Sequence, residues 1–193
     1  MTRQIRFHYF LLAATCAAIQ AAPRVARETV FTLDPARTEV KFALHATLHT
    51  VHGTFQLKHG SMRLDFDTGK AGGEIVVDTP SAKTGNSTRD RTMHQEVLES
   101  ELYPEAVFIP DHVEGHVLPE GKSELKIHGM LKLHGTEHAM TLPVEVEADG
   151  GKYVASTHFT VPYVEWGMKK PNKPLLRVGE TVEVEVRAET GVR

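Results

Sequence analysis

Histidine is the side chain in this sequence with the widest range of chemistry, and it is abundant. The chain of 193 residues contains 12 histidines, and a neutral imidazole is the commonest metal ligand in proteins. Two groups are close in sequence, namely His45, His49, His52 and His59, and then His128, His134 and His138. These groups raise the hypothesis of a metal site, or of a His-dependent or metal-dependent hydrolase that uses His45, His49 or His52.

The arrangement of the histidines argues against an interior metal site. The His-Glu-x-x-His spacing of zinc hydrolases is absent. Where the sequence alternates between apolar and polar residues, His45, His128 and His158 fall opposite the apolar side chains, so we expect them to face solvent. The sequence therefore predicts no metal site, and the hydrolase stays an alternative.

Nucleophilic and acid–base catalysis have no better candidates. Cys16 is the only cysteine, and neither a Gly-x-Ser-x-Gly motif nor a glycine-rich phosphate loop is present. Glu99 and Glu101 are two residues apart in a predicted helix and so point to different faces, which does not suit paired acid–base work. We predict a protein without catalytic residues and without a cofactor.

Two polar segments contain residues suited to the mouth of a pocket, one at 84–90 and one at 162–171. Tyrosine and tryptophan have an apolar body and a polar tip, which suits a boundary between protein and water. From these segments we predict four residues that contact a ligand headgroup: Arg89, Tyr163, Trp166 and Lys169. The alternatives are a turn and helix cap tied by an Arg–Asp contact, and a loop that plugs the core with Trp166.

The N-terminal segment resembles a secretory signal peptide. Arg3 and Arg6 precede an apolar run at 7–19, and the small residues Ala21 and Ala22 follow it. That run is too short to span a bilayer, which needs ~20 residues. We predict a signal peptide at 1–21, a linker at 22–28 and one domain at 29–190; lipoprotein processing at Cys16 is the alternative.

Export limits what the mature domain can be. Loss of Arg3 and Arg6 changes the formal net charge from −3 to about −5, and no basic face is evident, so we predict no nucleic-acid partner. Loss of Cys16 leaves no cysteine for a disulfide, so the apolar core must supply the stability, as a domain of this size allows.

Alternation of apolar and polar residues dominates the rest of the sequence. It is clearest at 40–48, 125–133, 140–147 and 182–187, with turn residues such as Asp67-Thr68-Gly69 between the runs. Eight or nine short strands at this spacing predict an antiparallel meander, closed as a barrel or stacked as a sandwich. One segment differs: a capping box at Thr92 and apolar residues at helical spacing predict a short helix near 92–102.

Five motifs in sequence order resemble the YceI-like family over residues 29–190. They are FALHATLHTVHGTF at 42–55, TPSAKTGNSTRD at 79–90, Tyr103-Pro104 with Phe108, HGMLKLHG at 128–135, and Trp166-Gly167. The resemblance implies an extended, lipocalin-like, eight-stranded antiparallel barrel with one helix, located in the periplasm. It also implies a tunnel that binds isoprenoid chains or other long amphiphiles, and in some relatives an association with membrane cytochromes that use quinones.

The inward-facing residues agree with a tunnel, because they mix large side chains with small ones. An eight-stranded barrel has an interior that side chains fill or that holds one small ligand. We predict that the tunnel is lined by Phe42, Leu44, Leu48, Phe55, Phe66, Leu98, Leu131 and Phe159. The predicted function is a periplasmic carrier of a polyisoprenoid, quinone or fatty-acid derivative. The alternatives are the hydrolase and an interaction module for a membrane redox protein with a solid barrel, and a homodimer is a further prediction.

Overall fold

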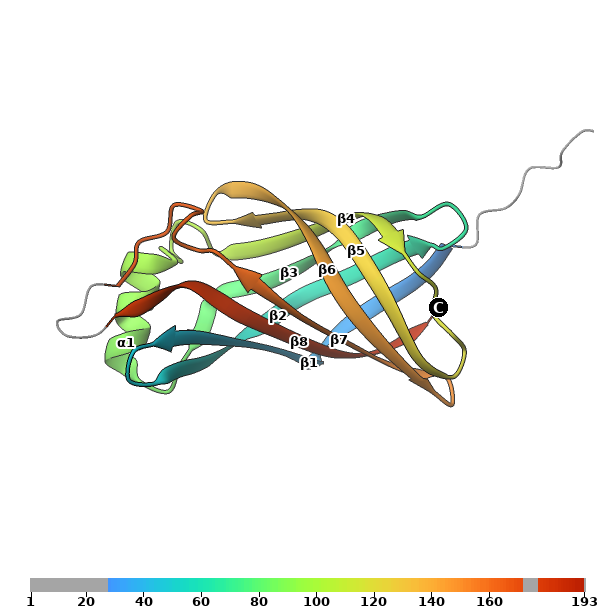
Figure 1. Cartoon of the computed structure of the whole chain (residues 1–193), viewed down its shortest axis with the longest axis horizontal. Coiled ribbons are helices and arrows are strands. Elements are labelled where there is room, and N and C mark those ends of the chain that lie inside the picture. The colour runs from blue at the N-terminus through green and yellow to red at the C-terminus, as the bar shows by residue number, and fades with distance from the viewer. Residues whose placement is uncertain (1–27, 172–176, 193) are drawn as a thin grey trace, which may run out of the picture.

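The computed structural model describes residues 28–171 and 177–192, and they form one closed antiparallel barrel (Figure 1). Each strand pairs with the next along the chain, and β8 pairs with β1 to close the barrel. The strands are β1 (Glu28–Ala46), β2 (Thr50–Asp65), β3 (Lys70–Lys83), β4 (Glu105–Glu114), β5 (Gly121–Leu133), β6 (Thr136–Asp149), β7 (Lys152–Val161) and β8 (Val178–Val192). The predicted eight-stranded barrel is confirmed, and the sandwich is not formed.

Alternation in the sequence sets which face of each strand is buried. In β6 every second residue from Leu142 to Ala148 is buried, and the residues between them are exposed. Such a strand has one apolar face, which it can bury only toward the barrel interior. Closure of the barrel then gives each of these eight strands a neighbour on both sides.

β1 contains an irregularity where the pairing register shifts between Leu33 and Thr38. Pro35 has no N–H to donate to a neighbouring strand. The turn is held locally instead: the Ala36 N–H donates to Asp34 Oδ1 at 2.9 Å, and the Thr38 hydroxyl donates to the Asp34 carbonyl at 2.8 Å. β1 therefore bends there and continues in a new register.

The helical segment begins earlier than the sequence predicted. It consists of α1 (Ser87–Thr92) followed by a π-helical turn, η1 (Met93–Val97). Asn86 is the N-cap, because it has extended backbone angles and its side chain accepts from the Arg89 N–H at 3.0 Å. The observed helix therefore starts earlier than the one predicted near 92–102: Thr92 lies inside the helical segment, and residues 98–102 are not helical.

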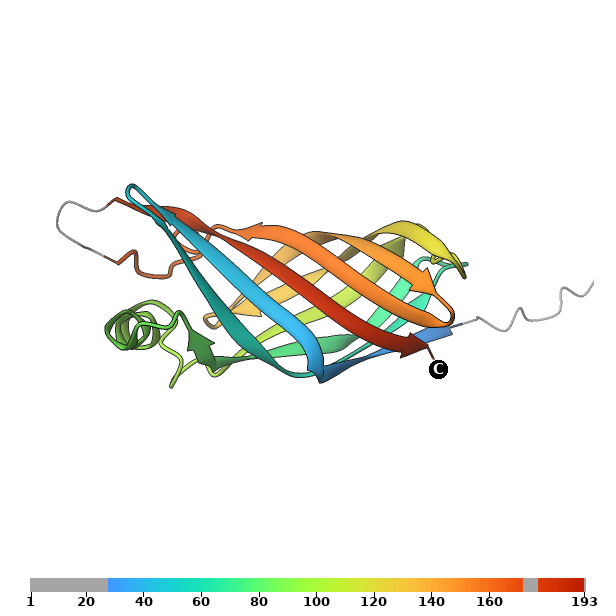
Figure 2. The same ribbon diagram turned by 90° about the horizontal axis from the view of Figure 1, so that it is seen from below.

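The two ends of the barrel differ. The helical segment, the β1–β2 turn and the connection after β7 lie at one end, and the C-terminus lies at the other (Figures 1 and 2). At the C-terminal end the interior is filled by a buried apolar cluster that includes Phe31, Leu64, Val113, Leu125 and Val146. We call this the filled end and the other the helix end. No helix among the described residues is long and apolar enough to span a membrane.

The predicted signal peptide and its cleavage site lie outside the described residues, as does the predicted linker up to residue 27. Glu28, the last residue of that linker, is the first residue of β1.

Candidate functional site

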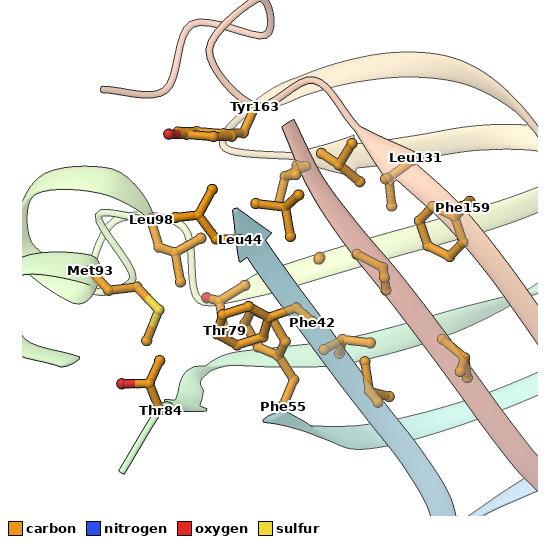
Figure 3. Close-up of a pocket in the computed structure, with 18 of the residues that line it drawn as sticks. Phe42, Leu44, Phe55, Thr79, Thr84, Met93, Leu98, Leu131, Phe159 and Tyr163 are labelled. Atoms are coloured by element: carbon orange, nitrogen blue, oxygen red, sulfur yellow. The ribbon is translucent and has the colours of Figure 1, made fainter. Parts of the chain in front are cut away.

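A cavity of about 850 Å³ occupies the barrel from the helix end toward the middle. All eight strands and the helical segment contribute to its wall. Seven of the eight residues predicted to line a tunnel lie in this wall: Phe42, Leu44, Leu48, Phe55, Leu98, Leu131 and Phe159. Figure 3 shows Leu98, which follows η1, beside Leu44 of β1, with Met93 of η1 near Leu98 and with Leu131 and Phe159 further along the barrel.

Phe66 was wrongly predicted as a lining residue. β2 ends at Asp65, so Phe66 belongs to the β2–β3 turn at the filled end. Its side chain packs against the buried cluster there, with its ring 6.2 Å from that of His116. Alternation extrapolated beyond the last strand residue therefore misplaced it.

The cavity opens at the helix end. Leu48, in the β1–β2 turn, lines the cavity and is still 79% exposed, and the neighbouring His49 also lines it and is exposed. Asn86 and Thr88 lie in the wall on the helix side and are exposed as well. These residues form the rim of the opening.

Two phenylalanines narrow the cavity behind the rim. The ring centroids of Phe42 and Phe55 are 5.1 Å apart, and Figure 3 shows the two rings side by side. Gly53, directly opposite Phe42 on β2, makes this possible, because a Cβ at position 53 would lie 2.2 Å from Phe42 Cζ. The Phe42 ring thus occupies the space over Gly53.

Arg89 supplies the positive charge in the wall. Of the described residues that line the cavity, it is the only lysine, arginine, aspartate or glutamate. Its Nε donates to Thr84 Oγ1 at 2.7 Å and its Nη2 to the Thr84 carbonyl at 3.0 Å. The Asp90 carboxylate accepts from the N–H and the hydroxyl of the same threonine. Arg89 and Asp90 are therefore joined through Thr84, and the guanidinium stays at the opening.

Of the three residues predicted from the 162–171 segment, only Tyr163 lines the cavity. Tyr163 lines the cavity and is only 3% exposed, but its hydroxyl donates to the Gly179 carbonyl at 2.8 Å. Burial, with a smaller effect of the Glu180 charge, raises the pKa of Tyr163 to about 12. The phenol is therefore neutral at physiological pH and its proton is already donated within the protein.

Trp166 and Lys169 do not line the cavity, which corrects their predicted position. The indole of Trp166 stacks on the imidazole of His138, with centroids 3.9 Å apart and planes 5° from parallel. Lys169 Nζ contacts Glu96 Oε2 at 3.2 Å, which ties the 162–171 segment to η1.

Met168 and Pro171 of the same segment line the cavity instead. No periodic pattern indicated Met168, because it lies in an irregular loop.

The described histidines are spread over several parts of the barrel, although two of them share one glutamate. His45 Nε2 is 3.3 Å from Glu183 and its Nδ1 is 3.0 Å from Thr50, while His158 approaches the same Glu183 at 3.8 Å. His45 and His158 are exposed and His128 is half-buried. Across residues 28–171 and 177–192, no three His, Cys, Asp or Glu side chains are grouped closely enough to hold a metal ion.

Comparisons with known proteins agree with this architecture. A family model described as YceI-like domain matches residues 31–190. Burkholderia cenocepacia BcnA has a similar fold, with a TM-score of 0.65 and 16% identity over 81% of this chain and 98% of BcnA. A polyisoprenoid-binding domain from Saccharophagus degradans, implicated in plant cell wall breakdown, has a TM-score of 0.65 and 17% identity over 84% and 98% of the two chains.

The Campylobacter jejuni YceI protein also shares the fold. Its TM-score is 0.58 at 19% identity, over 76% of this chain and 88% of that one. No curated protein matches the sequence.

Proposed function

The chain belongs to the YceI-like domain family, and we propose on that basis that it is a binding or carrier protein that encloses a long-chain amphiphile. The ligand is a polyisoprenoid, a quinone with an isoprenoid tail or a fatty-acid derivative, and the protein performs no catalysis. Signal-peptide features in residues 1–21 support export, and the family resemblance supports the periplasm as its location.

The observation that carries this proposal is the apolar cavity. Its volume of about 850 Å³ lies toward the upper end of the roughly 300–1,000 Å³ typical of ligand pockets. Each buried methylene contributes about 0.8 kcal/mol, whereas association costs an estimated 4–15 kcal/mol. A short chain would gain too little to bind, so the cavity favours long chains. The Saccharophagus domain, named as polyisoprenoid-binding, supports the same ligand class.

The rim supports an orientation for a charged amphiphile. Arg89 is at the opening and Thr88 lies in the wall beside it, whereas the hydroxyls of Thr84 and Thr92 already donate to Asp90 and to the Thr88 carbonyl. An anionic headgroup, such as a carboxylate or phosphate, would find both charge and hydrogen bonds there. The hydrocarbon chain would then extend past Phe42 toward the middle of the barrel.

The alternatives gain less support. A solid barrel that serves only as an interaction module is contradicted by the cavity. The hydrolase alternative keeps one of its three histidines at the opening, His49, but His45 faces away from the cavity and His52 does not line it. A membrane redox protein that supplies or accepts the lipid, and a homodimer, stay predictions.

The test is to identify what the protein carries. Native mass spectrometry of the full chain, purified from an exporting host without detergent, should show a co-purified long-chain lipid. Leu44→Trp places an indole in the cavity and should remove that lipid, whereas Ala43→Trp, on the outer face of the same strand, should keep it. A wild-type protein that is empty and ignores added polyprenols, quinones and fatty acids would overturn the proposal.

A further inference from the structure

One buried hydroxyl in the cavity wall lacks a partner. Across residues 28–171 and 177–192, Thr157 Oγ1 is the buried side-chain oxygen that makes no hydrogen bond. Thr79, another cavity-lining threonine, differs because its hydroxyl donates to the Tyr103 carbonyl. A buried polar group without a partner is destabilising and rare, so each case calls for a physical reason.

The position of Thr157 explains why the protein itself cannot satisfy it. On β7 it shares the inward face with Ala155, Phe159 and Val161, all of which line the cavity. Its direct neighbours across the sheet are Val144 on β6 and Val186 on β8, whose side chains have no polar atom. The hydroxyl is therefore buried among apolar neighbours, and a turn about the Cα–Cβ bond would bring it into the cavity that Thr157 lines.

Thr157 also lies near the inner limit of the cavity. Ala155, the next inward residue toward the filled end, still lines the cavity, but Tyr153 beyond it does not. The Tyr153 ring instead packs edge-on against Phe31 of the buried cluster, with centroids 6.3 Å apart. On β7, Thr157 and Ala155 are therefore the innermost of the inward residues that line the cavity.

Valine would fit this position without a buried polar atom. The neighbouring inward positions on β8 are Val182, Val184 and Val186, which line the same cavity. Threonine has the same β-branched shape but adds a hydroxyl that must be desolvated. A hydroxyl at this depth is useful only if something that enters the cavity bonds to it.

We propose that Thr157 is an inner hydrogen-bonding point that selects a long chain with an uncharged oxygen group at its deepest end. The inference rests on the proposed function and narrows its ligands to long chains that carry an uncharged oxygen at the end that binds deepest. A hydroxyl or carbonyl oxygen would pair with Thr157. A charged group would not, because the only charged side chain in the described wall is Arg89 at the opening.

Two kinds of lipid share this chemistry. A neutral lipid, such as a long-chain alcohol, could enter with its oxygen foremost. An acid with a second oxygen at the far end of its chain could place the carboxylate near Arg89 and the hydroxyl at Thr157. The two sources differ in whether a carboxylate is also required.

The experiment compares matched ligands on the full chain. The probes are a saturated fatty acid against its ω-hydroxy derivative, and a primary alcohol against the alkane of equal length, each displacing a fluorescent long-chain probe. Wild type should prefer the oxygenated member by about five-fold. Thr157→Val should abolish that preference, and Thr157→Ser should retain it. Thr160→Val, on the exposed face of β7, is the control and should behave as wild type.

The outcomes separate the two proposals. A preference for the alcohol alone indicates that a neutral lipid enters with its oxygen first. A preference for the ω-hydroxy acid alone indicates an acid that carries a second oxygen at the far end of its chain. Either result supports a hydrogen bond to Thr157. Equal binding of plain and oxygenated chains, or a preference that survives Thr157→Val, overturns it and leaves the carrier function intact. Failure of every chain to bind overturns the carrier function itself.

Discussion

Nε2 of His134 donates to Oε2 of Glu99 at 2.7 Å, and this contact joins the end of the helical segment to the β5–β6 turn. Both residues have positive φ angles, 43° for Glu99 and 51° for His134. Such angles are uncommon outside glycine and persist where surrounding contacts impose them. The His134 ring also packs 4.3 Å from that of Tyr103. The contact therefore fastens the helical wall of the cavity to the barrel.

Removal of this contact should loosen the helix end. For His134→Ala we expect a loss of about 1 kcal/mol in unfolding free energy, or a melting temperature lower by roughly 2–4 °C. Ligand release should be faster, because the helical segment forms part of the opening. Stopped-flow displacement measures the release rate. His158→Ala, on the outer face, should leave both quantities unchanged, and an unaltered release rate in His134→Ala would contradict the idea.

Gly53→Ala should destabilise the barrel by about 1–3 kcal/mol. The added Cβ would lie 2.2 Å from Phe42 Cζ and 2.7 Å from the Lys83 carbonyl oxygen. Phe42→Leu in the same chain should recover part of the loss, since only the backbone clash then remains. Urea denaturation measures both variants. Gly72→Ala is the control, because the nearest atom to its Cβ is the end of the Arg63 side chain at 3.4 Å.

Arg89→Met should weaken binding of a long-chain carboxylate about tenfold, because a hydrogen-bonded charge at the opening is lost. Binding of an uncharged chain of equal length should change much less. Titration of the two ligands by fluorescence displacement gives both affinities. Arg91→Met removes an exposed arginine of α1 that does not line the cavity, so it should affect neither ligand. Equal losses for both ligands in Arg89→Met would point to distortion around Thr84 instead.

Tyr163 should make the protein less stable at high pH. Its pKa rises from 10.0 to about 12 on folding, because burial disfavours the phenolate. The neutral phenol therefore contributes stability that is complete below pH 10 and is lost as the pH rises toward 12. Denaturation across that range should show a steeper fall for wild type than for Tyr163→Phe. Parallel curves would contradict this assignment. At neutral pH the variant should lose about 1 kcal/mol, because Gly179 loses its donor.

The sequence predicted which face of each strand points inward, but not how far along the barrel the interior is open. Alternation is a local property, so it placed Phe42, Phe55 and Leu131 on the inner face correctly. The boundary between cavity and filled end depends on side chains from distant strands, such as Phe31 and Leu64, and alternation cannot locate it. Alternation also does not show where a strand ends, and Phe66 was misplaced because β2 ends at Asp65.

Loop residues were predicted less well because their positions depend on contacts distant in sequence. Trp166 stacks on His138 and Lys169 contacts Glu96, and neither partner follows from spacing. The helix start was misplaced because Thr92 and Asn86 both fit a capping pattern. Asn86 is the cap, with Gly85 at φ of 77° just before it and its own side chain bonded to the Arg89 N–H. The lack of a hydrogen-bond partner for Thr157 depends on its neighbours across the sheet, and no local pattern in the sequence indicates those.

Because the barrel is filled at one end, the cavity is closed there. A ligand that enters beside the helical segment must dissociate through the same opening, so a bound ligand prevents a second one from entering. A hydrocarbon chain longer than the cavity would extend past Leu48 into solvent, where a bilayer or an acceptor protein could bind it.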